Sequence, residues 1–554
     1  MGGILVESGW MEKSINLIDT DILIIGTGIA GLSAALKASG AGKRVVVVSK
    51  AAVGKVTNTS LGGGLFTFAT DTFPVEAHLK KTMESGRMIN NPVMVEHMVN
   101  LAPSRVRNLI EMGLKGQFHE TGFRCRTSGY LGGPHLSSVL VNACRKAEME
   151  FFEHIMVTDL LVDSDECRGA VGFHKQSGKI IGFRSNAVLL ATGGAGAIYA
   201  HTDNAPGATG DGYALMLEAG LELIDMEFVQ FYPTAYAGTG RARMMLPAAF
   251  ADLSPILNRL GEDVKEKYQI KDKPVAVVSR DRLSRALFKE IRMGNGMDGA
   301  LQLDLRETDF GSIPNGPAMV KTFKKRLAFD KKPVSVGPTC HHTMGGVATD
   351  EAGRTDLKGL FAAGEVVGGT HGANRMGGNA YCEALVLGDA AARSALAHRP
   401  NAKHPTDFKT LAENAVKKKI RFFDSRSETT PAIDSPRKKL AAIMWEKVGI
   451  VREEKSLTEA VEEIDAVLES IELNKGRTPG GLCKIIESRN AALTGRAIAV
   501  SALKRTESRG SHWRDDFPHE VENWLQHIHV QMSEGVPQIR RIIPIPVRPL
   551  KVCR

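Results

Sequence analysis

The sequence predicts an α/β fold, with a parallel β-sheet in the first part of the chain and helices toward its end. An apolar run at residues 21–25 leads directly into a glycine-rich turn, and a second apolar run at residues 187–190 ends in another. Residues 457–471 instead carry apolar side chains at helical intervals. Short apolar runs that end in glycine turns are typical of strands buried on both faces of a parallel sheet.

The first strand leads into residues 26–31, Gly-Thr-Gly-Ile-Ala-Gly, which form a G-x-G-x-x-G turn. We expect a helix over residues 32–39 and a second strand over residues 44–49. This order is that of a Rossmann-like unit, in which the pyrophosphate of a dinucleotide binds at the helix N-terminus. The acidic residue that usually ends the second strand is replaced by Ser49 and Lys50, so this segment alone does not select the cofactor.

Later glycine-rich segments favour a flavin over a nicotinamide cofactor. They are residues 191–196 (Ala-Thr-Gly-Gly-Ala-Gly), 209–212 (Thr-Gly-Asp-Gly) and 360–365 (Leu-Phe-Ala-Ala-Gly-Glu). A nicotinamide-binding Rossmann domain occupies one contiguous part of a chain, whereas flavoproteins return to their cofactor late in the sequence. Three separated loops therefore indicate one long ligand.

The composition is that of an ordinary globular protein, with 43% hydrophobic and 24% charged residues. No apolar run approaches the roughly 18 residues of a membrane span, and the N-terminus lacks the pattern of an export signal. We expect a cytoplasmic protein that has no transmembrane segment and is soluble or peripheral to a membrane complex. The sequence leaves open whether Met1 or Met11 is the true start.

Cysteines and charges exclude two classes of function. The seven cysteines lie far apart without a Cys-x-x-Cys pair, so we expect no metal centre in this chain. The formal net charge of +9 comes from scattered basic clusters such as residues 324–326 and 417–419. Aromatic residues do not alternate with these clusters, so we expect no nucleic-acid binding.

The end of the chain predicts helices followed by an extended arm. Ser456 and Glu459 have the spacing of a capping box just before the apolar positions of residues 457–471. Residues 542–550 contain three prolines, which excludes a regular helix there.

Together these segments resemble the flavoprotein subunit family of succinate dehydrogenase and fumarate reductase, whose relatives include L-aspartate oxidase and soluble fumarate reductases. The resemblance covers nearly the whole chain. The residues that carry it are 26–31, 191–194, 209–212, 226–234 (Met-Glu-Phe-Val-Gln-Phe-Tyr-Pro-Thr), 279–281 (Ser-Arg-Asp), 338–346 (Pro-Thr-Cys-His-His-Thr-Met-Gly-Gly), 363–379 and 506–512. For residues 506–512, buried salt bridges and a functional role both stay open.

The resemblance implies a domain organisation. A Rossmann-like FAD-binding domain at residues 15–235 and 335–400 is interrupted by an α+β capping domain at residues 236–334. A helical C-terminal domain at residues 405–530 and an extended arm at residues 531–554 would follow. Substrate would bind between the FAD-binding domain and the cap.

The glycine loops and the resemblance together give the expected cofactor contacts. Membrane-bound members attach the flavin through a histidine in the loop that corresponds to residues 55–64, and this loop contains none, so we expect non-covalent FAD. The expected FAD-binding residues are Gly26, Gly28, Ile29, Ala30, Gly31, Ser49, Lys50, Thr57, Gly63, Gly64, Ala191, Thr192, Gly193, Gly194, Asp211, Glu365, Asn379 and Ala380.

The resemblance also assigns the substrate site. Arg375 and His341 would hold a substrate carboxylate, and Arg280 would lie near the carbon that gains or loses a proton. These three residues are the expected catalytic set, with Tyr232 and His342 as further substrate-binding candidates. An arginine provides a planar fork of donors that can grip a carboxylate through two hydrogen bonds.

Two departures from the family pattern affect the substrate. Tyr232 stands where the family usually has a histidine, so the second anion site lacks a positive charge. Residues 246–252 (Leu-Pro-Ala-Ala-Phe-Ala-Asp) replace a segment that supplies a carboxylate-binding threonine and a proton relay. Arg241, Arg243 and Asp252 are candidate substitutes. A substrate with one carboxylate, or one larger than fumarate, is therefore open.

The leading hypothesis is an FAD-dependent oxidoreductase of fumarate reductase/succinate dehydrogenase type. It would move a hydride between the flavin and a carbon next to a carboxylate, and exchange electrons with a separate iron–sulfur subunit. One alternative is an enzyme like L-aspartate oxidase, which acts on a C–N bond and needs no such partner. Another is an electron-transfer flavoprotein with a changed or lost substrate.

Overall fold

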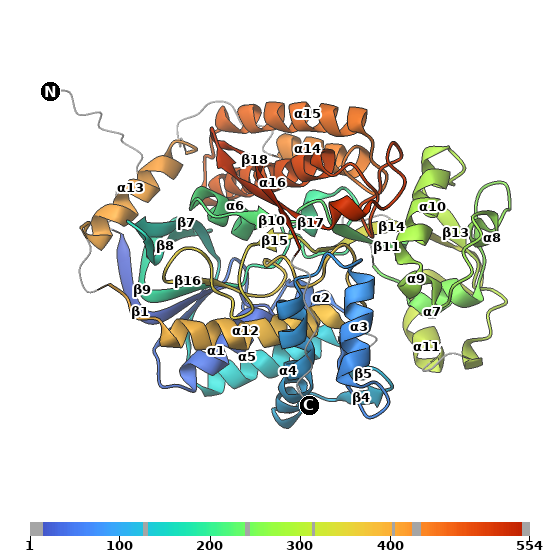
Figure 1. Ribbon diagram of the computed structural model, residues 1–554, viewed down its shortest axis with the longest axis horizontal. Helices are drawn as coiled ribbons and strands as arrows, with labels where there is room; N and C mark the ends of the chain where they lie inside the picture. The colour runs from blue at the N-terminus through green and yellow to red at the C-terminus, as the bar shows by residue number, and fades with distance from the viewer. Residues whose placement is uncertain are drawn as a thin grey trace.

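The computed structural model describes residues 15–125, 131–238, 244–312, 316–401, 405–423 and 434–545 (Figure 1). A seven-stranded sheet has the strand order β6-β2-β1-β9-β8-β7, with β16 beside β9. Its parallel part contains β6, β2, β1, β9 and β16, whereas β7 and β8 extend it in antiparallel fashion. The strands are β1 (Asn16–Ile25), β2 (Val45–Val48), β6 (Glu150–Phe152), β7 (Ile155–Asp163), β8 (Glu166–His174), β9 (Ile180–Leu190) and β16 (Leu360–Ala362).

The register of this sheet brings the glycine loops together. Ile25 of β1 lies between Val48 of β2 and Leu190 of β9. The carboxyl ends of these parallel strands therefore reach the same edge, where ligands bind in open α/β sheets. β1 starts five residues before the predicted strand. Residues 16–20 are mostly exposed and lack the continuous apolar run by which residues 21–25 were recognised.

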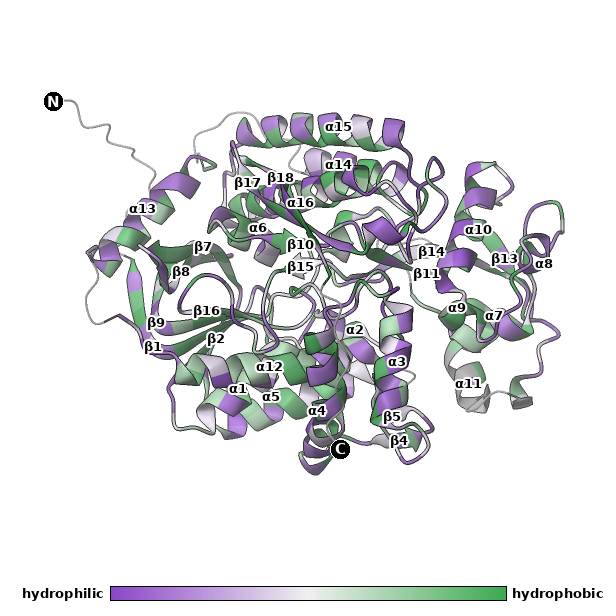
Figure 2. Cartoon of the chain, in the orientation of Figure 1, coloured by the Kyte–Doolittle hydropathy of each residue, from purple (hydrophilic) through white to green (hydrophobic). Residues whose placement is uncertain are grey.

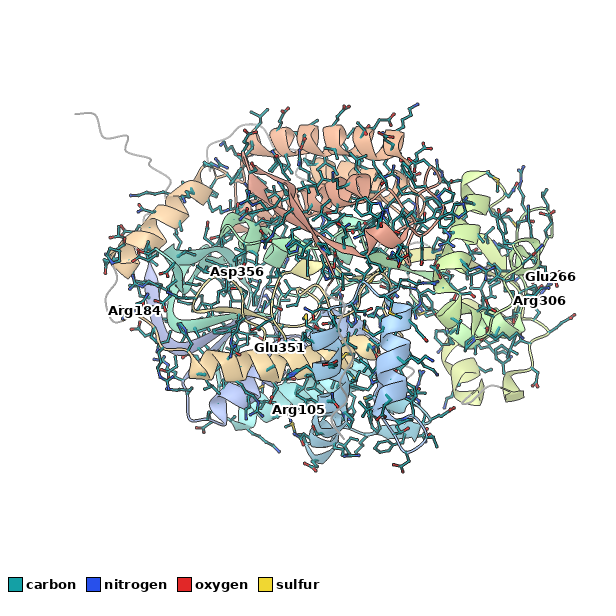
Figure 3. The ribbon with its side chains drawn as sticks, viewed as in Figure 1. Arg105, Arg184, Glu266, Arg306, Glu351 and Asp356 are labelled. Carbon is teal, nitrogen blue, oxygen red and sulfur yellow. The ribbon has the colours of Figure 1, made fainter. Side chains whose placement is uncertain are left out.

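Helices cover the face of the sheet that lies lower in Figure 1. Gly388 lets α1 and α12 approach closely, since a Cβ there would lie 2.6 Å from the carbonyl oxygen of Ala30. Arg105 of α4, labelled in Figure 3, pairs with Asp389 of α12 at 2.9 Å. The helices that precede the second lobe in the chain, together with α12, are α1 (Ile29–Ser39), α2 (Asn58–Leu61), α3 (Val75–Ser85), α4 (Pro92–Glu111), α5 (Gly133–Lys146), α6 (Asp211–Glu218) and α12 (Asn379–Ala397). A small sheet of β3 (Leu65–Thr67), β5 (Gly122–Cys125) and β4 (Gly116–His119) lies nearby.

A second lobe, on the right in Figure 1, is built between β11 and β14. It has its own apolar core, in which Leu246, Phe250, Phe323 and Phe329 are buried. Its sheet has the order β11-β14-β13-β12, so two long strands connect the lobe to the rest of the protein. The elements are β11 (Val229–Tyr236), α7 (Ala248–Leu253), β12 (Ile256–Leu257), α8 (Val264–Lys267), α9 (Val275–Val278), α10 (Arg280–Arg292), β13 (Leu301–Leu303), α11 (Gly316–Leu327) and β14 (Val334–Thr343).

The C-terminal part begins with helices. Those helices are α13 (Phe408–Ile420), α14 (Asp434–Glu446), α15 (Glu454–Glu472) and α16 (Pro479–Lys504). The apolar and polar stripes of α15 are visible in Figure 2. The expected capping box is displaced, because Glu453 is the N-cap of α15 and Ser456 is its third helical residue. The Ser456 hydroxyl accepts a hydrogen bond from the Glu453 amide, so the helix begins before Ser456.

The expected extended arm belongs largely to a β-hairpin. Strands β17 (Gln526–Ser533) and β18 (Val536–Pro544) pair with each other, and β17 also pairs with β10 (Leu223–Ile224), which pairs with β15 (Gly346–Val347). The expected boundary between residues 530 and 531 thus falls inside β17. The domain boundaries as a whole stay a prediction. Among the described residues, no helix is both long and apolar enough to span a membrane.

Candidate functional site

The glycine turn after β1 is fixed by close contact with the loop after β9. Gly26 has φ +120°, and a Cβ there would lie 2.1 Å from the carbonyl oxygen of Ala191. A Cβ on Gly31 would lie 2.2 Å from the carbonyl oxygen of Gly26. Only glycine fits at either position, and these contacts set Gly28, Ile29 and Ala30 at the start of α1.

Several features of this edge fit the phosphates and ribityl chain of FAD. Helix α1 begins after Gly28, which has no side chain to cap it, and the Thr59 hydroxyl accepts from the Ile29 amide at 3.0 Å. The helix dipole still favours an anion at this end. Gly193 has φ +77°, and a Cβ there would meet nothing within 4 Å. The Thr192 hydroxyl is buried with no hydrogen-bond partner among the described residues. Gly63 also borders open space, whereas Gly194 lies against the Glu365 carboxylate. These residues would hold the cofactor.

Lys50 is an internal ion-pair centre at the same edge. Its ammonium lies 2.5 Å from Asp211 and 2.7 Å from Glu487, and it donates to the carbonyl oxygen of Gly207. Burial acts to lower the pKa of Lys50, but the two carboxylates outweigh it and raise the pKa above its ordinary value. Ser49 contacts the Thr27 hydroxyl at 3.1 Å. Both residues that replace the usual acid therefore stabilise the loops.

Some expected cofactor residues use their side chains elsewhere. The Asn379 amide binds His78 and Thr82, each at 2.9 Å, so only the backbone of Asn379 and Ala380 at the start of α12 remains available. The Thr57 hydroxyl accepts from the Ser60 amide and caps α2. Gly64 packs against Gly132, where a Cβ would approach to 2.8 Å.

Two buried arginines converge on one neutral acceptor. Arg280 donates to the side-chain oxygen of Gln230 at 2.6 Å, and Arg375 donates to the same oxygen at 2.9 Å. The Gln230 NH₂ group donates to Asn374 Oδ1 and to the carbonyl oxygen of Arg375, which fixes the amide orientation. Gln230 lies on β11 and Arg280 is the first residue of α10, so three separate segments build this point.

The arginine pair is not neutralised in the described part of the chain. Neither Arg280 nor Arg375 forms an ion pair there, because the neighbouring Asp281 pairs with Arg285 at 3.2 Å. Burial and the charge of Arg280 lower the pKa of Arg375 to about 9, and burial also lowers the pKa of Arg280. A cation at the first residue of a helix additionally opposes the helix dipole. The pair therefore favours an anion.

His341 reaches this site through a β-bulge. Gln230 pairs with His342, but Phe231 pairs with Cys340, so His341 is the extra residue of β14. Bulges re-aim side chains next to active sites. The His341 Nδ1 atom lies 2.8 Å from Asp203 Oδ2.

His342 of β14 and His371 form a neutral pair. Their ring centroids are 5.3 Å apart with the rings nearly perpendicular. His342 Nδ1 lies 3.4 Å from Glu365 Oε1, and both ring nitrogens of His371 lack partners among the described residues. Burial and the charge of Arg375 lower the pKa of His371 to about 3. Both rings therefore carry no charge beside the arginines.

Tyr232 connects the two departures from the family pattern. Its hydroxyl donates to the carbonyl oxygen of Leu246 at 2.7 Å, in the segment that replaces the expected proton relay. The Tyr232 ring centroid lies 5.8 Å from the Arg280 guanidinium carbon and 5.9 Å from the His341 ring centroid. The Asp252 carboxylate accepts a hydrogen bond from the amide of Val275, the first residue of α9. Arg241 and Arg243 lie outside the described residues.

The structure thus brings Arg280, His341 and Arg375 together, and it adds residues that the sequence reasoning missed. Gln230 lies inside a motif that was identified, but nothing in the sequence marked it as the shared acceptor. Asp203 carried no signal, because its contact with His341 spans 138 positions. His371 lies in the glycine-rich segment at residues 371–379. The sequence does not show that its ring is buried, or that both ring nitrogens lack hydrogen-bond partners among the described residues.

The segment of residues 506–512 forms buried ion pairs, and its Ser511 lines the same small pocket as Gln230 and Arg280. Arg505 binds Glu227 at 2.6 Å and Glu507 at 3.1 Å, with both partners fully buried. Arg509 binds both oxygens of Glu507. These contacts anchor the C-terminal hairpin and support a structural role.

Comparison with known proteins identifies the family. A family described as "FAD binding domain" matches residues 21–381, and "Fumarate reductase flavoprotein C-term" matches residues 437–551. The chain is 34% identical to one of the subunits of the "Fumarate reductase (CoM/CoB)" of Methanothermobacter marburgensis, covering 92% of this chain and 97% of that relative. It is 31% identical to "L-aspartate oxidase 2-a, chloroplastic" of Nicotiana tabacum, covering 91% and 82%.

Comparison with solved structures points to the same family. The E. coli quinol fumarate reductase flavoprotein superposes with a TM-score of 0.87 at 26% identity, over 98% of this chain and 99% of that one. The Mycobacterium smegmatis Sdh1 complex gives a TM-score of 0.85 at 28% identity, over 97% and 96%. The expected mixed α/β fold with a helical C-terminal region is confirmed. The chain therefore belongs to the FAD-binding fumarate reductase/succinate dehydrogenase flavoprotein family, and it is an FAD-dependent oxidoreductase that acts on CH–CH donors.

Proposed function

We propose that this enzyme moves a hydride between non-covalently bound FAD and a carbon next to a carboxylate, in an organic acid with one carboxylate or with a body larger than fumarate. The observation that carries this proposal is the un-neutralised pair of Arg280 and Arg375 on Gln230. A carboxylate that entered here would accept charge-assisted hydrogen bonds from groups that now share one neutral oxygen.

Each residue of the site has a separate proposed role. Arg375 and His341 would hold the carboxylate, and withdraw charge from the adjacent double bond. Arg280 would hold the proton for the neighbouring carbon; its lowered pKa makes its guanidinium a better acid than it is in water. The neutral pair of His342 and His371 adds no competing charge. When bound, the FAD supplies or accepts the hydride.

The preference for one carboxylate follows from Tyr232. Its hydroxyl proton is already donated to Leu246, so it supplies neither a charge nor this donor to a second carboxylate. The lobe segment around Leu246 lacks the threonine that the family uses there.

Titration of the oxidised flavin spectrum with crotonate, cinnamate, fumarate and succinate tests this proposal. We expect the unsaturated monocarboxylates to perturb the spectrum at lower concentration than fumarate does. A site that binds fumarate at least tenfold more tightly than both monocarboxylates contradicts the substrate class. Absence of any perturbation by all four acids contradicts the anion site itself.

Non-covalent attachment is supported by the loop at residues 55–64, which contains no histidine. In this loop Thr57 caps α2, and Asn58 binds Asn204 and Glu365. Heat precipitation of the purified protein should leave the yellow colour in the supernatant. Colour that stays in the pellet contradicts this part of the proposal.

We also propose that the electrons come from a separate iron–sulfur subunit, since the similar methanogen protein is itself one component of a larger reductase. The reduced enzyme should then react slowly with oxygen but rapidly with artificial one-electron carriers. The similarity to L-aspartate oxidase supports a second candidate, which predicts ammonia and hydrogen peroxide release from aspartate.

A further inference from the structure

Asp203 and His341 form a carboxylate–imidazole pair beside the arginines. The distance between Asp203 Oδ2 and His341 Nδ1 is 2.8 Å, and the Asp203 side chain is 8% exposed. A carboxylate can only accept, so the proton of this hydrogen bond resides on Nδ1. The neutral form of His341 then has a lone pair on Nε2, which would repel a substrate carboxylate.

Two asparagine side chains fix the orientation of the Asp203 carboxylate. Asn204 Nδ2 donates to Asp203 Oδ1 at 3.0 Å and to the carbonyl oxygen of His341 at 2.9 Å. Asn58 Nδ2 donates to Asn204 Oδ1 at 2.7 Å and to Glu365 Oε2 at 3.0 Å. Both oxygens of Asp203 are therefore held, and the carboxylate cannot rotate away from the imidazole without breaking this chain.

The charges that face His341 oppose one another. Asp203 favours the imidazolium, whereas Arg375 and Arg280 disfavour it. The Tyr232 ring and His342 also lie near, and burial and Arg375 hold the pKa of His342 well below its ordinary value, so its ring is neutral. Burial, which is the largest effect, lowers the pKa of His341 despite Asp203, so the ligand-free ring is neutral at pH 7.

We propose that Asp203 is a positioning residue that makes substrate binding proton-linked: His341 takes up one proton at Nε2 when an organic carboxylate binds, and Asp203 holds the resulting imidazolium. This inference rests on the proposed function, because it needs a carboxylate between Arg375 and His341. That carboxylate offsets the two guanidinium charges, which leaves Asp203 as the dominant partner of the ring. The carboxylate held by Arg375 thereby gains a second cationic partner.

Isothermal titration calorimetry of the holoenzyme with crotonate and fumarate, in buffers of different ionisation enthalpy, tests the proposal. At pH 7.5 we expect uptake of close to one proton per bound acid, and a Kd that rises up to tenfold per pH unit above neutrality. Asp203→Asn keeps an acceptor for Nδ1–H but removes the charge. It should weaken binding at pH 7 on the order of 10- to 100-fold and reduce proton uptake, with a smaller loss at lower pH.

His341→Gln is the second variant, because it removes the titrating ring whether or not Asp203→Asn folds. It should bind either acid weakly and without proton uptake, while FAD content and thermal stability stay near wild type. Unchanged proton uptake in Asp203→Asn, or in His341→Gln, overturns the inference and leaves the proposed function standing. A wild-type enzyme that binds neither acid contradicts both.

Discussion

Replacing Arg375 should weaken ligand binding and leave the ligand-free protein no less stable. In the ligand-free site, Arg375 donates to Gln230 at 2.9 Å and to the carbonyl oxygen of Met376 at 3.2 Å, and its buried Nε has no partner among the described residues. Arg375→Met removes a buried charge that has no counter-charge of its own. Arg375→Lys keeps a charge but loses the planar fork.

The magnitude follows from these contacts. A bound carboxylate would gain two hydrogen bonds to a charged group, each contributing about 1.5 to 3 kcal/mol, and would displace the hydrogen bond of about the same strength from this charged group to Gln230. The net loss in Arg375→Met is therefore about 1.5 to 3 kcal/mol, or roughly 10- to 150-fold in Kd. Arg375→Lys should lose roughly half of that free energy.

The stability of the ligand-free protein should not fall in Arg375→Met. The pKa of Arg375 is lowered to about 9 from 12.5, which means that the charged form is disfavoured in the folded protein. Removing it relieves that penalty, although the methionine leaves Gln230 with one donor fewer. We expect the melting temperature of ligand-free Arg375→Met to equal or exceed that of the wild type.

Flavin difference spectra with crotonate and differential scanning fluorimetry measure both effects. Arg393→Met is the matched control, because Arg393 lies on α12 and pairs with Asp389 at the surface. It should bind crotonate like the wild type. The reasoning fails if Arg375→Met binds crotonate within about threefold of wild type, or if it loses bound FAD.

Three other substitutions have expected outcomes. Burial and Glu365 raise the pKa of Glu383 to about 8 from 4.5, so the wild type loses stability as pH rises from 4.5 to 8. Glu383→Gln should therefore be more stable than the wild type by about 2 to 4 kcal/mol at pH 8.5 but not at pH 5. Equal melting-temperature differences between the two proteins at both pH values would disprove this. Lys50→Met leaves the half-buried Asp211 without a cation and Glu487 with only Arg437 at 3.7 Å, and it should cost about 3 to 5 kcal/mol in urea unfolding. A midpoint that matches wild type at pH 7.5 would contradict the ion-pair role. Tyr232→His should raise the affinity for fumarate relative to crotonate about tenfold at pH 6, and an unchanged Kd ratio would remove Tyr232 from the account of specificity.

Local patterns in the sequence predicted the glycine turns at the expected cofactor edge. The turn at residues 26–31 and the loop at residues 191–194 depend on glycine at positions where a Cβ would collide with backbone, so their conformation is encoded within a few residues. The capping box of α15 was misplaced by three positions because Glu453 also accepts a hydrogen bond at that helix start. The hairpin at residues 526–544 was not predicted, because the prolines of residues 542–550 indicated only an extended chain end, and Pro544 alone of them lies in the hairpin.

The sequence by itself determined which chemical groups the site contains: glycine turns that approach a dinucleotide, and arginines and histidines in segments that resemble a known family. Tertiary structure alone decided how those groups are partnered. The shared acceptor Gln230, the bulge that exposes His341 and the distant Asp203 all depend on contacts between segments more than 50 positions apart or on the register of two strands. Hydrogen bonds at that separation are set by packing of whole elements, because no local propensity specifies them.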